Sequence, residues 1–394
     1  MKIDSKIIRI IGTFIIIEFC LQLVTFGRYA WGQYSQKQAE NDIVARTWAL
    51  RDPTFRAVFN EESNVWEEYY PFVGWRTREM HTPHINVSAD GIRTTVGNSA
   101  TVAGLPTIYF LGGSAMWGEG LTDDTTIPSL VVKQLNSQSP AAAVFNYGEI
   151  GYVSTQEVLR LALLLKSGKR PDHVIFYDGC NDFFVSALDS RVHETYRDDR
   201  MKSVLGNIWA LPDDSETVRT HDNTTIFSTG FWQQVFSAAI KYIQIIRYPM
   251  EIYNTLHHDA ISAKPQGSVS DAGKTEAIAN NYVENIRLVD ALSQTYHFDY
   301  LLFWQPTVYS YDLTPEERNL PGIHPDRYTQ FSRMYHDAAQ IIGQKLGGKF
   351  IDLSRIYEGT KGPIFTDSCH VTVEGNRTVS ERIAKELQSA WGFR

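Results

Sequence analysis

From Pro106 onwards, short apolar runs alternate with longer amphipathic stretches. The amphipathic segments Ser154–Gly168 and Val373–Trp391 repeat their apolar residues with the period of an α-helix. This alternation predicts an α/β fold, a three-layer α/β/α sandwich whose parallel sheet is covered on both faces. Five apolar runs have the length and composition of buried strands: Thr107–Leu111, Ala142–Asn146, His173–Tyr177, Asp299–Trp304 and Lys349–Leu353.

Local signals mark some of the predicted boundaries. Ser154 is expected to be the N-cap of its helix, with Glu157 three residues later as in a capping box, and Gly168 ends the helix. Upstream, "HINVSADGIRTT" alternates apolar and polar residues about Asp90-Gly91, a pair typical of a hairpin turn. We therefore divide the chain beyond residue 27 into a membrane-proximal stalk and small β element (28–104) and a main domain (105–394).

One segment breaks the strand–helix rhythm. Residues 189–273 are aromatic in the middle and carry little strand signal, which indicates a helical insertion over the site. Within this segment, Phe231–Leu256 is long enough to cross a bilayer, but Lys241 and Arg247 argue against a membrane span.

The N-terminus differs from that of an ordinary soluble enzyme. Lys2, Lys6 and Arg9 precede the largely apolar segment Ile10–Phe26, and no small-residue cleavage signature follows closely. We interpret residues 1–27 as an uncleaved membrane anchor that leaves the rest of the chain outside the cytoplasm, in the periplasm or extracellular space. Glu18 argues against this, and the alternative is an amphipathic or buried helix.

Composition and charge narrow the class of protein. The 394 residues are 43% hydrophobic and 21% charged, as in ordinary globular proteins. The net charge of −8 gives no basic field for nucleic acid, so nucleic-acid binding is not expected. Aromatic residues make up 12% of the chain, which indicates either a large core or a site that stacks on flat ligands such as sugar rings.

Polar candidates follow the predicted strands. Ser114 comes just after the first strand, Asn181 after the third, and Asp367 with His370 after the fifth, while Gly151 follows the second. Because the carboxyl ends of parallel strands share one edge of a sheet, we expect these residues to meet there.

Their chemistry is complementary. His370 is a base able to take the proton of the Ser114 hydroxyl, and Asp367 is placed to orient the imidazole. The backbone N–H groups of Ser114 and Gly151 and the Asn181 amide are candidate donors to an oxyanion. Two glycines before Ser114 permit a sharp strand-to-helix corner that exposes the hydroxyl. This predicted chemistry needs no metal or other cofactor.

Four motifs in this order resemble those of the SGNH hydrolase superfamily, also called GDSL-type esterases. They are Gly112-Gly113-Ser114, a glycine five residues after an asparagine (Asn146 to Gly151), Gly179-Cys180-Asn181-Asp182, and Asp367-Ser368-Cys369-His370. The resemblance covers roughly Pro106–Trp391 and implies a flavodoxin-like fold and a serine esterase. Gly113 departs from the family's usual aspartate. Such variants occur among membrane-tethered members that look like polysaccharide-modifying enzymes.

The resemblance therefore implies removal or transfer of O-acetyl or other short acyl groups on extracytoplasmic carbohydrate, with an acylated carbohydrate or other ester as substrate. Two alternatives stay open. One is a lipase or phospholipase at the membrane, and the other is a non-catalytic envelope assembly protein. Acyl-chain preference would separate the first from a carbohydrate esterase.

Three further residues, Trp117, Phe183 and Gln305, flank strand ends and are candidates for substrate binding, although core packing is the commoner fate of such aromatics. Cys180 and Cys369 adjoin Asn181 and His370, so they could form a disulfide outside the cytoplasm or pack as two buried thiols. His257-His258 lacks a third ligand at a useful spacing and is interpreted as surface.

Overall fold

The computed structural model describes residues 13–14, 16–24, 26–27, 31, 48–99, 102–137, 139–189 and 270–393. Contacts divide the chain into two compact units. One consists of Ile43–Asp199 and Val269–Arg394, and the other of Met1–Asp42 and Arg200–Ser268. The fold and the site described below belong to the first unit, which we call the sheet unit.

The bounds of the elements follow from the backbone geometry. The strands are β1 (Glu67–Tyr70), β2 (Gly74–Thr77), β3 (Met80–His81), β4 (Asn86–Val87), β5 (Thr107–Gly112), β6 (Ala143–Asn146), β7 (His173–Asp178), β8 (Asp299–Trp304) and β9 (Phe350–Asp352). The α-helices are α2 (Pro53–Glu62), α3 (Ser114–Trp117), α4 (Ile127–Leu135), α5 (Ser154–Lys166), α6 (Cys180–Asp189), α10 (Asp271–Tyr296), α11 (Tyr328–Leu346) and α12 (Val373–Trp391).

The main sheet has five parallel strands in the order β6-β5-β7-β8-β9. Numbered along the chain, this is the order 2-1-3-4-5 of flavodoxin-like folds, which bind ligands beyond the carboxyl ends of the strands, where the order reverses. The central strands are almost entirely buried because both faces of the sheet are covered. The loops after β5 and β7 leave the sheet side by side at the reversal point.

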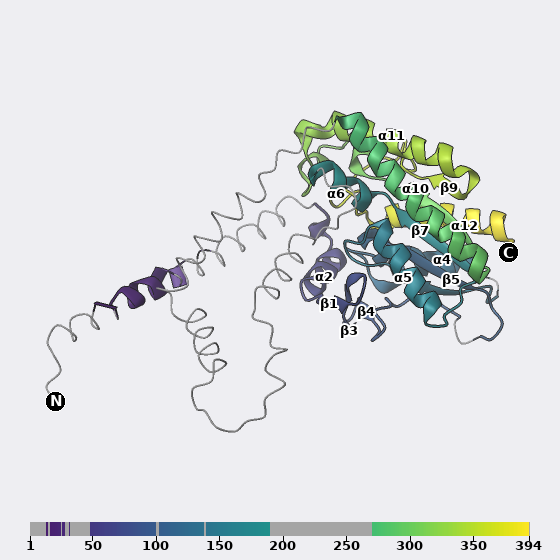
Figure 1. The fold of residues 1–394 in the computed structure, drawn as a ribbon, viewed down its shortest axis with the longest axis horizontal. Helices are drawn as coiled ribbons and strands as arrows, with labels where there is room; N and C mark the ends of the chain where they lie inside the picture. The colour runs from purple at the N-terminus through teal and green to yellow at the C-terminus, as the bar shows by residue number, and fades with distance from the viewer. Residues whose placement is uncertain are drawn as a thin grey trace, which may run out of the picture. The chain divides into compact units, whose positions relative to one another are not determined.

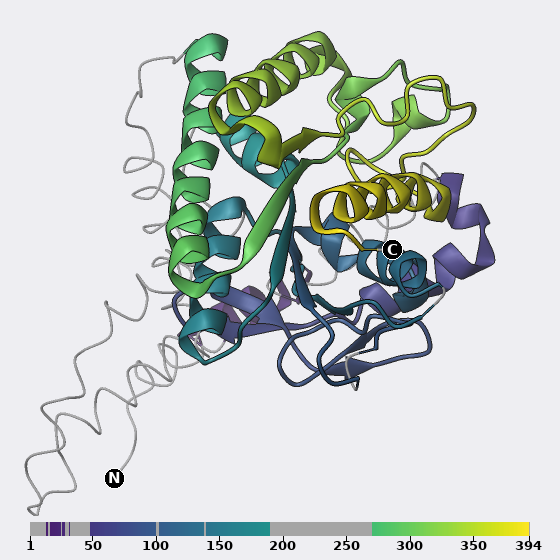
Figure 2. The ribbon, with the colours of Figure 1, turned by 90° about the vertical axis from the view of Figure 1, so that its right-hand side faces the viewer.

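Helices cover the sheet on both faces, as Figure 2 shows. On one face α10 packs against α5, α6 and α11, and on the other α12 packs against α4. Aromatic residues fill the space between sheet and helices, for example Trp304 against Tyr282 and Tyr335. The three-layer α/β/α architecture expected from the sequence is therefore the one observed.

Most predicted boundaries agree with the structure, and one local prediction is wrong. The strand Asp299–Trp304 and the helix Val373–Trp391 have the predicted ends. Ser154 is the first residue of α5 rather than its N-cap, because Val153 takes the N-cap conformation. The Asp182 carboxylate, in the first turn of α6, accepts the Ser154 backbone N–H at 3.1 Å and its hydroxyl at 2.5 Å.

Residues 48–99, within the segment expected to be a stalk and small β element, belong to the sheet unit and contact the loop after β6. The antiparallel pairs β1–β2 and β3–β4 lie here (Figure 1). The Ser88–Gly91 turn forms at the predicted Asp90-Gly91 position, with the Gly91 N–H donating to the Ser88 carbonyl at 2.8 Å. The Trp75 indole N–H donates to the carbonyl of Ile150 at 2.9 Å.

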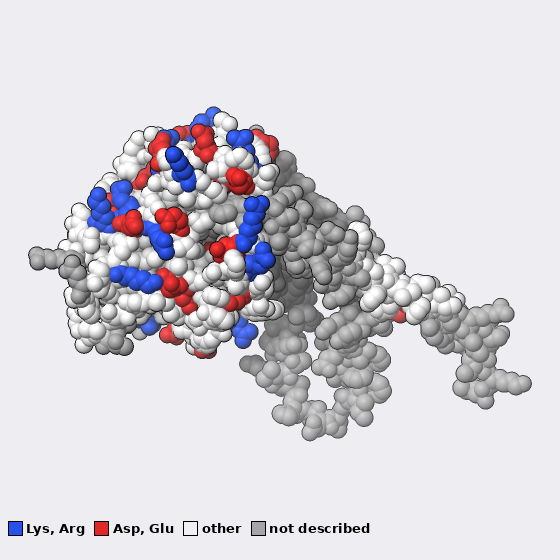
Figure 3. Space-filling model, turned by 180° about the vertical axis from the view of Figure 1, so that it is seen from behind, with Lys and Arg blue, Asp and Glu red and all other residues white. Residues whose placement is uncertain are grey.

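Two sequence predictions fall largely outside the described residues. Among the residues that the structure describes, no helix combines the length and the apolar character required to cross a membrane. The predicted insertion at 189–273 is described only at its two ends, and His257-His258 lies outside the described residues. Acidic and basic side chains are interspersed over the face of the described part seen in Figure 3, without a continuous basic area.

Candidate active site

Ser114 lies on the corner between β5 and α3. Gly113 is the extended N-cap of α3, and Ser114 is the first helical residue, 7% exposed. A Cβ at Gly113 would lie 2.4 Å from Nδ2 of Asn181 and 3.3 Å from the carbonyl oxygen of Tyr152. A larger residue at this corner would force the amide of Asn181 to move, because that amide occupies the place of a side chain.

His370 and Asp367 reach Ser114 from the loop that precedes α12. Phe365 and Val371 form an isolated antiparallel bridge that closes this loop. Asp367 Oδ1 accepts the backbone N–H groups of Cys369 and His370, each at 2.8 Å. Asp367 Oδ2 lies 2.5 Å from Nδ1 of His370, and Nε2 of His370 lies 2.7 Å from the Ser114 hydroxyl. The structure thus joins the three residues in one hydrogen-bonded chain.

Electrostatics favour the charged forms of His370 and Asp367. Burial of the His370 ring opposes its protonation, but the carboxylates of Asp367 and Glu119 outweigh this and raise its pKa well above the usual value. Burial works against the Asp367 carboxylate as well, yet its bonds to His370 and to two backbone N–H groups lower its pKa. Asp367 is therefore a stable anion beside the ring, as the orienting member of a triad must be.

Asn181 lies beside the serine corner. Its Nδ2 donates to the Tyr152 carbonyl at 2.6 Å, which uses one of its two amide hydrogens and fixes the side chain. Ser114 N–H is at the first helical position, where the helix supplies no acceptor. Gly151 precedes Tyr152 in the same turn with a left-handed φ of 75°. The structure places the Asn181 amide beside Gly113. The role of the Gly151 N–H as an oxyanion donor stays a prediction.

Two acidic residues that the sequence reasoning missed stand next to the triad. Glu119 Oε2 lies 3.6 Å from Nε2 of His370. Glu62, at the end of α2, accepts the backbone N–H of Gly120 at 2.6 Å. Burial first, and then the charge of Glu119, raise the pKa of Glu62 to about 8. Neither residue belongs to a motif, so no pattern in the sequence pointed to them.

These residues line a cavity of about 170 Å³ at the triad, whose walls are Phe55, Phe59, Glu62, Glu119, Gly120, Pro321, Thr366, Asp367 and His370. An apolar cavity of about 380 Å³ shares Phe55 and Gly120 with it. A larger cavity of about 460 Å³ lies beside Tyr311 and Tyr328 but includes none of the three triad residues. We place the chemistry at the smallest of these cavities because His370 and Asp367 line it.

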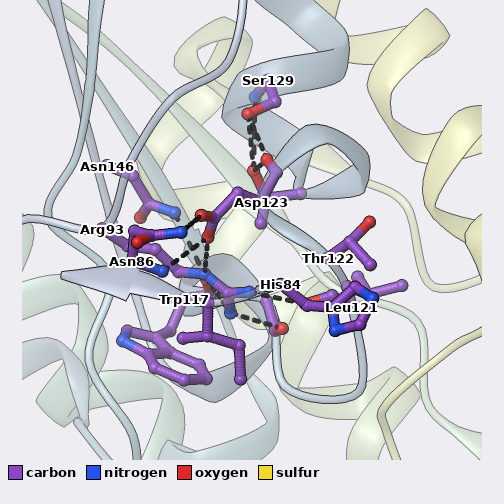
Figure 4. Close-up of polar contacts among 12 residues, drawn as sticks. His84, Asn86, Arg93, Trp117, Leu121, Thr122, Asp123, Ser129 and Asn146 are labelled. Carbon is purple, nitrogen blue, oxygen red and sulfur yellow. Dashed lines mark hydrogen bonds and ion pairs between the residues drawn. The ribbon is translucent and has the colours of Figure 1, made fainter. Parts of the chain in front are cut away.

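A buried arginine holds the loop that carries Glu119 (Figure 4). Arg93 is 0% exposed and donates to the carbonyl oxygens of Gly118 at 2.7 Å and Leu121 at 2.5 Å. Its Nε bonds Asp123 Oδ1 at 3.0 Å, and its guanidinium lies 4.2 Å from the ring centroid of Trp117. With four anchor points on residues 117–123, Arg93 fixes the direction in which this loop leaves α3.

The three tentative substrate-binding residues are core residues, so that prediction was wrong. Trp117 is 1% exposed and packs with Val58, Ile85 and Val87. Phe183 is 0% exposed among other aromatic rings, and Gln305 is 3% exposed. All three do follow strands, as the sequence indicated, but their side chains turn inward, which strand position alone does not specify.

Cys180 and Cys369 are free thiols, both buried. The Cys369 thiol contacts that of Cys180, so the segments after β7 and before α12 converge, as the sequence suggested. This contact and burial raise the pKa of the Cys369 thiol. Ligand atoms of Asp367, Cys369 and His370 all lie within 4.8 Å of one another, a spacing that could hold a metal ion. Both ring nitrogens of His370 already take part in hydrogen bonds, so a metal there would displace either Asp367 or Ser114.

Comparison with known proteins gives matches in structure only. No family model and no curated protein sequence matches the chain. A lipolytic protein of the G-D-S-L family from Desulfitobacterium hafniense has 9% identity and a TM-score of 0.36, covering 71% of this chain and 98% of its own. A lipase/acylhydrolase from Enterococcus faecalis has 14% identity and a TM-score of 0.38, covering 72% and 96%.

An acetylxylan esterase from Geobacillus stearothermophilus has 13% identity and a TM-score of 0.35, covering 75% of this chain and 96% of its own. Likeness at this level does not establish a function. The assignment for this chain therefore depends on the geometry of its own site.

Proposed function

We propose that this chain is a serine esterase of SGNH type that removes or transfers O-acetyl or other short acyl groups on extracytoplasmic carbohydrate. One observation carries the proposal. The Ser114 hydroxyl, the His370 ring and the Asp367 carboxylate form a continuous chain with links of 2.7 and 2.5 Å. This is the arrangement that acyl transfer through a serine requires.

In the first step, His370 Nε2 takes the proton of Ser114 as Oγ attacks the ester carbonyl carbon. Charge accumulates on the carbonyl oxygen, and the Ser114 N–H and the free amide hydrogen of Asn181 stabilise it. The imidazolium that forms is balanced by Asp367, whose own pKa is low. His370 then gives the proton to the leaving alcohol, the carbon–oxygen bond of the ester breaks, and an acyl group remains on Ser114.

In the second step, water or another alcohol loses its proton to His370 Nε2 and attacks the acyl carbon. Collapse of the intermediate returns the proton to Ser114 and releases a carboxylic acid or a new ester. The two reactions share every protein group, and they differ only in what occupies the acceptor place in the cavity.

The space beside His370 and Asp367 is small, about 170 Å³, and this supports a small ester as substrate. A specific observation favours the lipase alternative, because the adjoining apolar cavity of about 380 Å³ offers room for a longer chain. Activity that rises with acyl length on synthetic esters would identify a lipase, and activity limited to acetyl would support the carbohydrate esterase.

The proposal includes a membrane location, with Ile10–Phe26 as the anchor and the sheet unit in the periplasm or outside the cell. Basic residues before this apolar segment support that orientation. So do its described apolar side chains, since Phe14, Phe19 and Phe26 are each more than half exposed. Carbonate extraction of membranes tests this, because an anchored chain stays in the pellet.

The test of activity is hydrolysis of p-nitrophenyl acetate by the full chain in mild detergent, beside Ser114→Ala. We expect acetate release that the substitution abolishes, and a covalent acetyl adduct on the wild-type chain after rapid quenching. Equal background rates for the two proteins, with and without carbohydrate acceptors, would refute the proposed chemistry.

A further inference from the structure

The carboxylate of Glu119 stands where the alcohol part of an ester must pass. Glu119 Oε2 is 3.6 Å from the His370 nitrogen that also bonds Ser114. This nitrogen must deliver its proton to the leaving oxygen, which therefore has to come within about 3 Å of it. A group attached next to that oxygen then lies within reach of Glu119.

Glu119 lines the cavity at the triad and is paired with His370 at its edge. Its side chain is 37% exposed. The Glu62 carboxyl stands on the same wall and is fixed by the Gly120 N–H, while Arg93 holds the loop from behind. Glu119 thus offers carboxylate oxygens, which accept hydrogen bonds from hydroxyl groups and repel anions, while the raised pKa of Glu62 keeps that neighbour mostly uncharged at neutral pH.

Two phenylalanine rings of α2, those of Phe55 and Phe59, supply an apolar surface to the same cavity. One apolar wall and one hydrogen-bond-accepting wall suit a molecule with C–H groups on its faces and hydroxyl groups on its edge. A neutral carbohydrate has this distribution, whereas a phospholipid headgroup or an acidic sugar brings a negative charge toward Glu119.

Resting on the proposed esterase function, we propose that Glu119 selects substrates whose alcohol part carries a free hydroxyl next to the ester and no negative charge. Partially acetylated neutral sugars meet this condition. Glu119 is then a specificity-determining residue that contacts substrate, and Glu62 and Arg93 are positioning residues that act through it.

The test compares kcat/KM for two monoacetylated methyl xylosides, one with its remaining hydroxyls free and one with them methylated. For the wild-type full chain we expect a preference of about ten- to a hundredfold for the free hydroxyls, the range that a hydrogen bond to a charged group supplies. Glu119→Ala should reduce this preference to less than about twofold. Glu358→Ala, at a carboxylate 72% exposed and outside the cavity at the triad, is the matched control and should keep it.

A second pair tests the charge. An acetylated methyl glucuronate should be a poorer substrate than the acetylated methyl glucoside, and Glu119→Gln should narrow that difference because it removes the charge and keeps the shape. Circular dichroism melts verify that both variants fold.

The outcomes separate this inference from the proposed function. Equal losses on the free and methylated xylosides in Glu119→Ala would mean that Glu119 acts only through His370, and would overturn the inference while leaving the esterase intact. Absence of any Ser114-dependent hydrolysis in the wild type would overturn the proposed function, and this inference with it.

Discussion

Replacing Gly113 by alanine should lower the activity, although no residue with a proposed catalytic role is itself replaced. The new Cβ would lie 2.4 Å from Nδ2 of Asn181, about 1 Å closer than ordinary contact, so the amide has to move. That amide is held at 2.6 Å by the Tyr152 carbonyl, and moving it breaks this bond and displaces a donor to the oxyanion. Removal of one such donor costs about 3–4 kcal/mol, so kcat should fall about 10²–10³-fold.

The assay is kcat on p-nitrophenyl acetate at saturating ester, for Gly113→Ala, Asn181→Ala and the double variant. If Gly113→Ala acts by moving Asn181, the double variant should be no slower than Asn181→Ala, which gives a strongly non-additive cycle. Gly348→Ala is the matched control, because a Cβ there meets nothing within 4 Å. Wild-type kcat in Gly113→Ala, or additive losses in the cycle, would refute this account of the corner.

Three further outcomes follow from the charges in the site. The raised pKa of His370 means that kcat/KM should fall with decreasing pH at a midpoint above 6.5, and Glu119→Gln should move this midpoint to lower pH, measured as pH–rate profiles. Glu62 has a pKa of about 8 in the folded state and about 4.5 in the unfolded state. Its contribution to stability is therefore present at low pH and is lost as the pH rises from about 4.5 to 8. Glu62→Gln should be more stable than the wild type in thermal melts at pH 8.5 but not at pH 4. Arg93→Met leaves the buried Asp123 carboxylate without its ion-pair partner and should lower the free energy of unfolding in urea by about 3–5 kcal/mol. A decrease of less than about 1 kcal/mol would contradict this.

The sheet and the triad could be predicted because their signals are local. Buried parallel strands such as Asp299–Trp304 are continuous apolar runs, and the polar residues that follow them must meet at one edge. Helices α10 and α11 were not identified, since α10 begins inside the segment expected to be an insertion and carries its apolar residues with a weak period. The boundaries of α10 depend on packing against the sheet more than on its own pattern, whereas α11 is clearly amphipathic and its pattern was overlooked.

The walls of the site could not be predicted, because they depend on side-chain direction and on tertiary contacts. Trp117 comes only three residues after Ser114, yet its side chain is buried in the core against Arg93. Glu62 reaches the triad only because α2 docks on the loop that carries Glu119. No spacing in the sequence relates these residues, so only the folded chain shows that they share a cavity.

The wall formed by α2 has a consequence for how such a site can diversify. Phe55, Phe59 and Glu62 come from a segment upstream of the first sheet strand, while the serine, histidine and aspartate come from loops of the sheet itself. Substitutions in ten residues of α2 can thus reshape the entrance while the proton-transfer geometry stays as it is. The α2 part of the cavity wall is therefore encoded apart from the loops that carry Ser114, Asp367 and His370, whereas Glu119 shares its loop with Ser114.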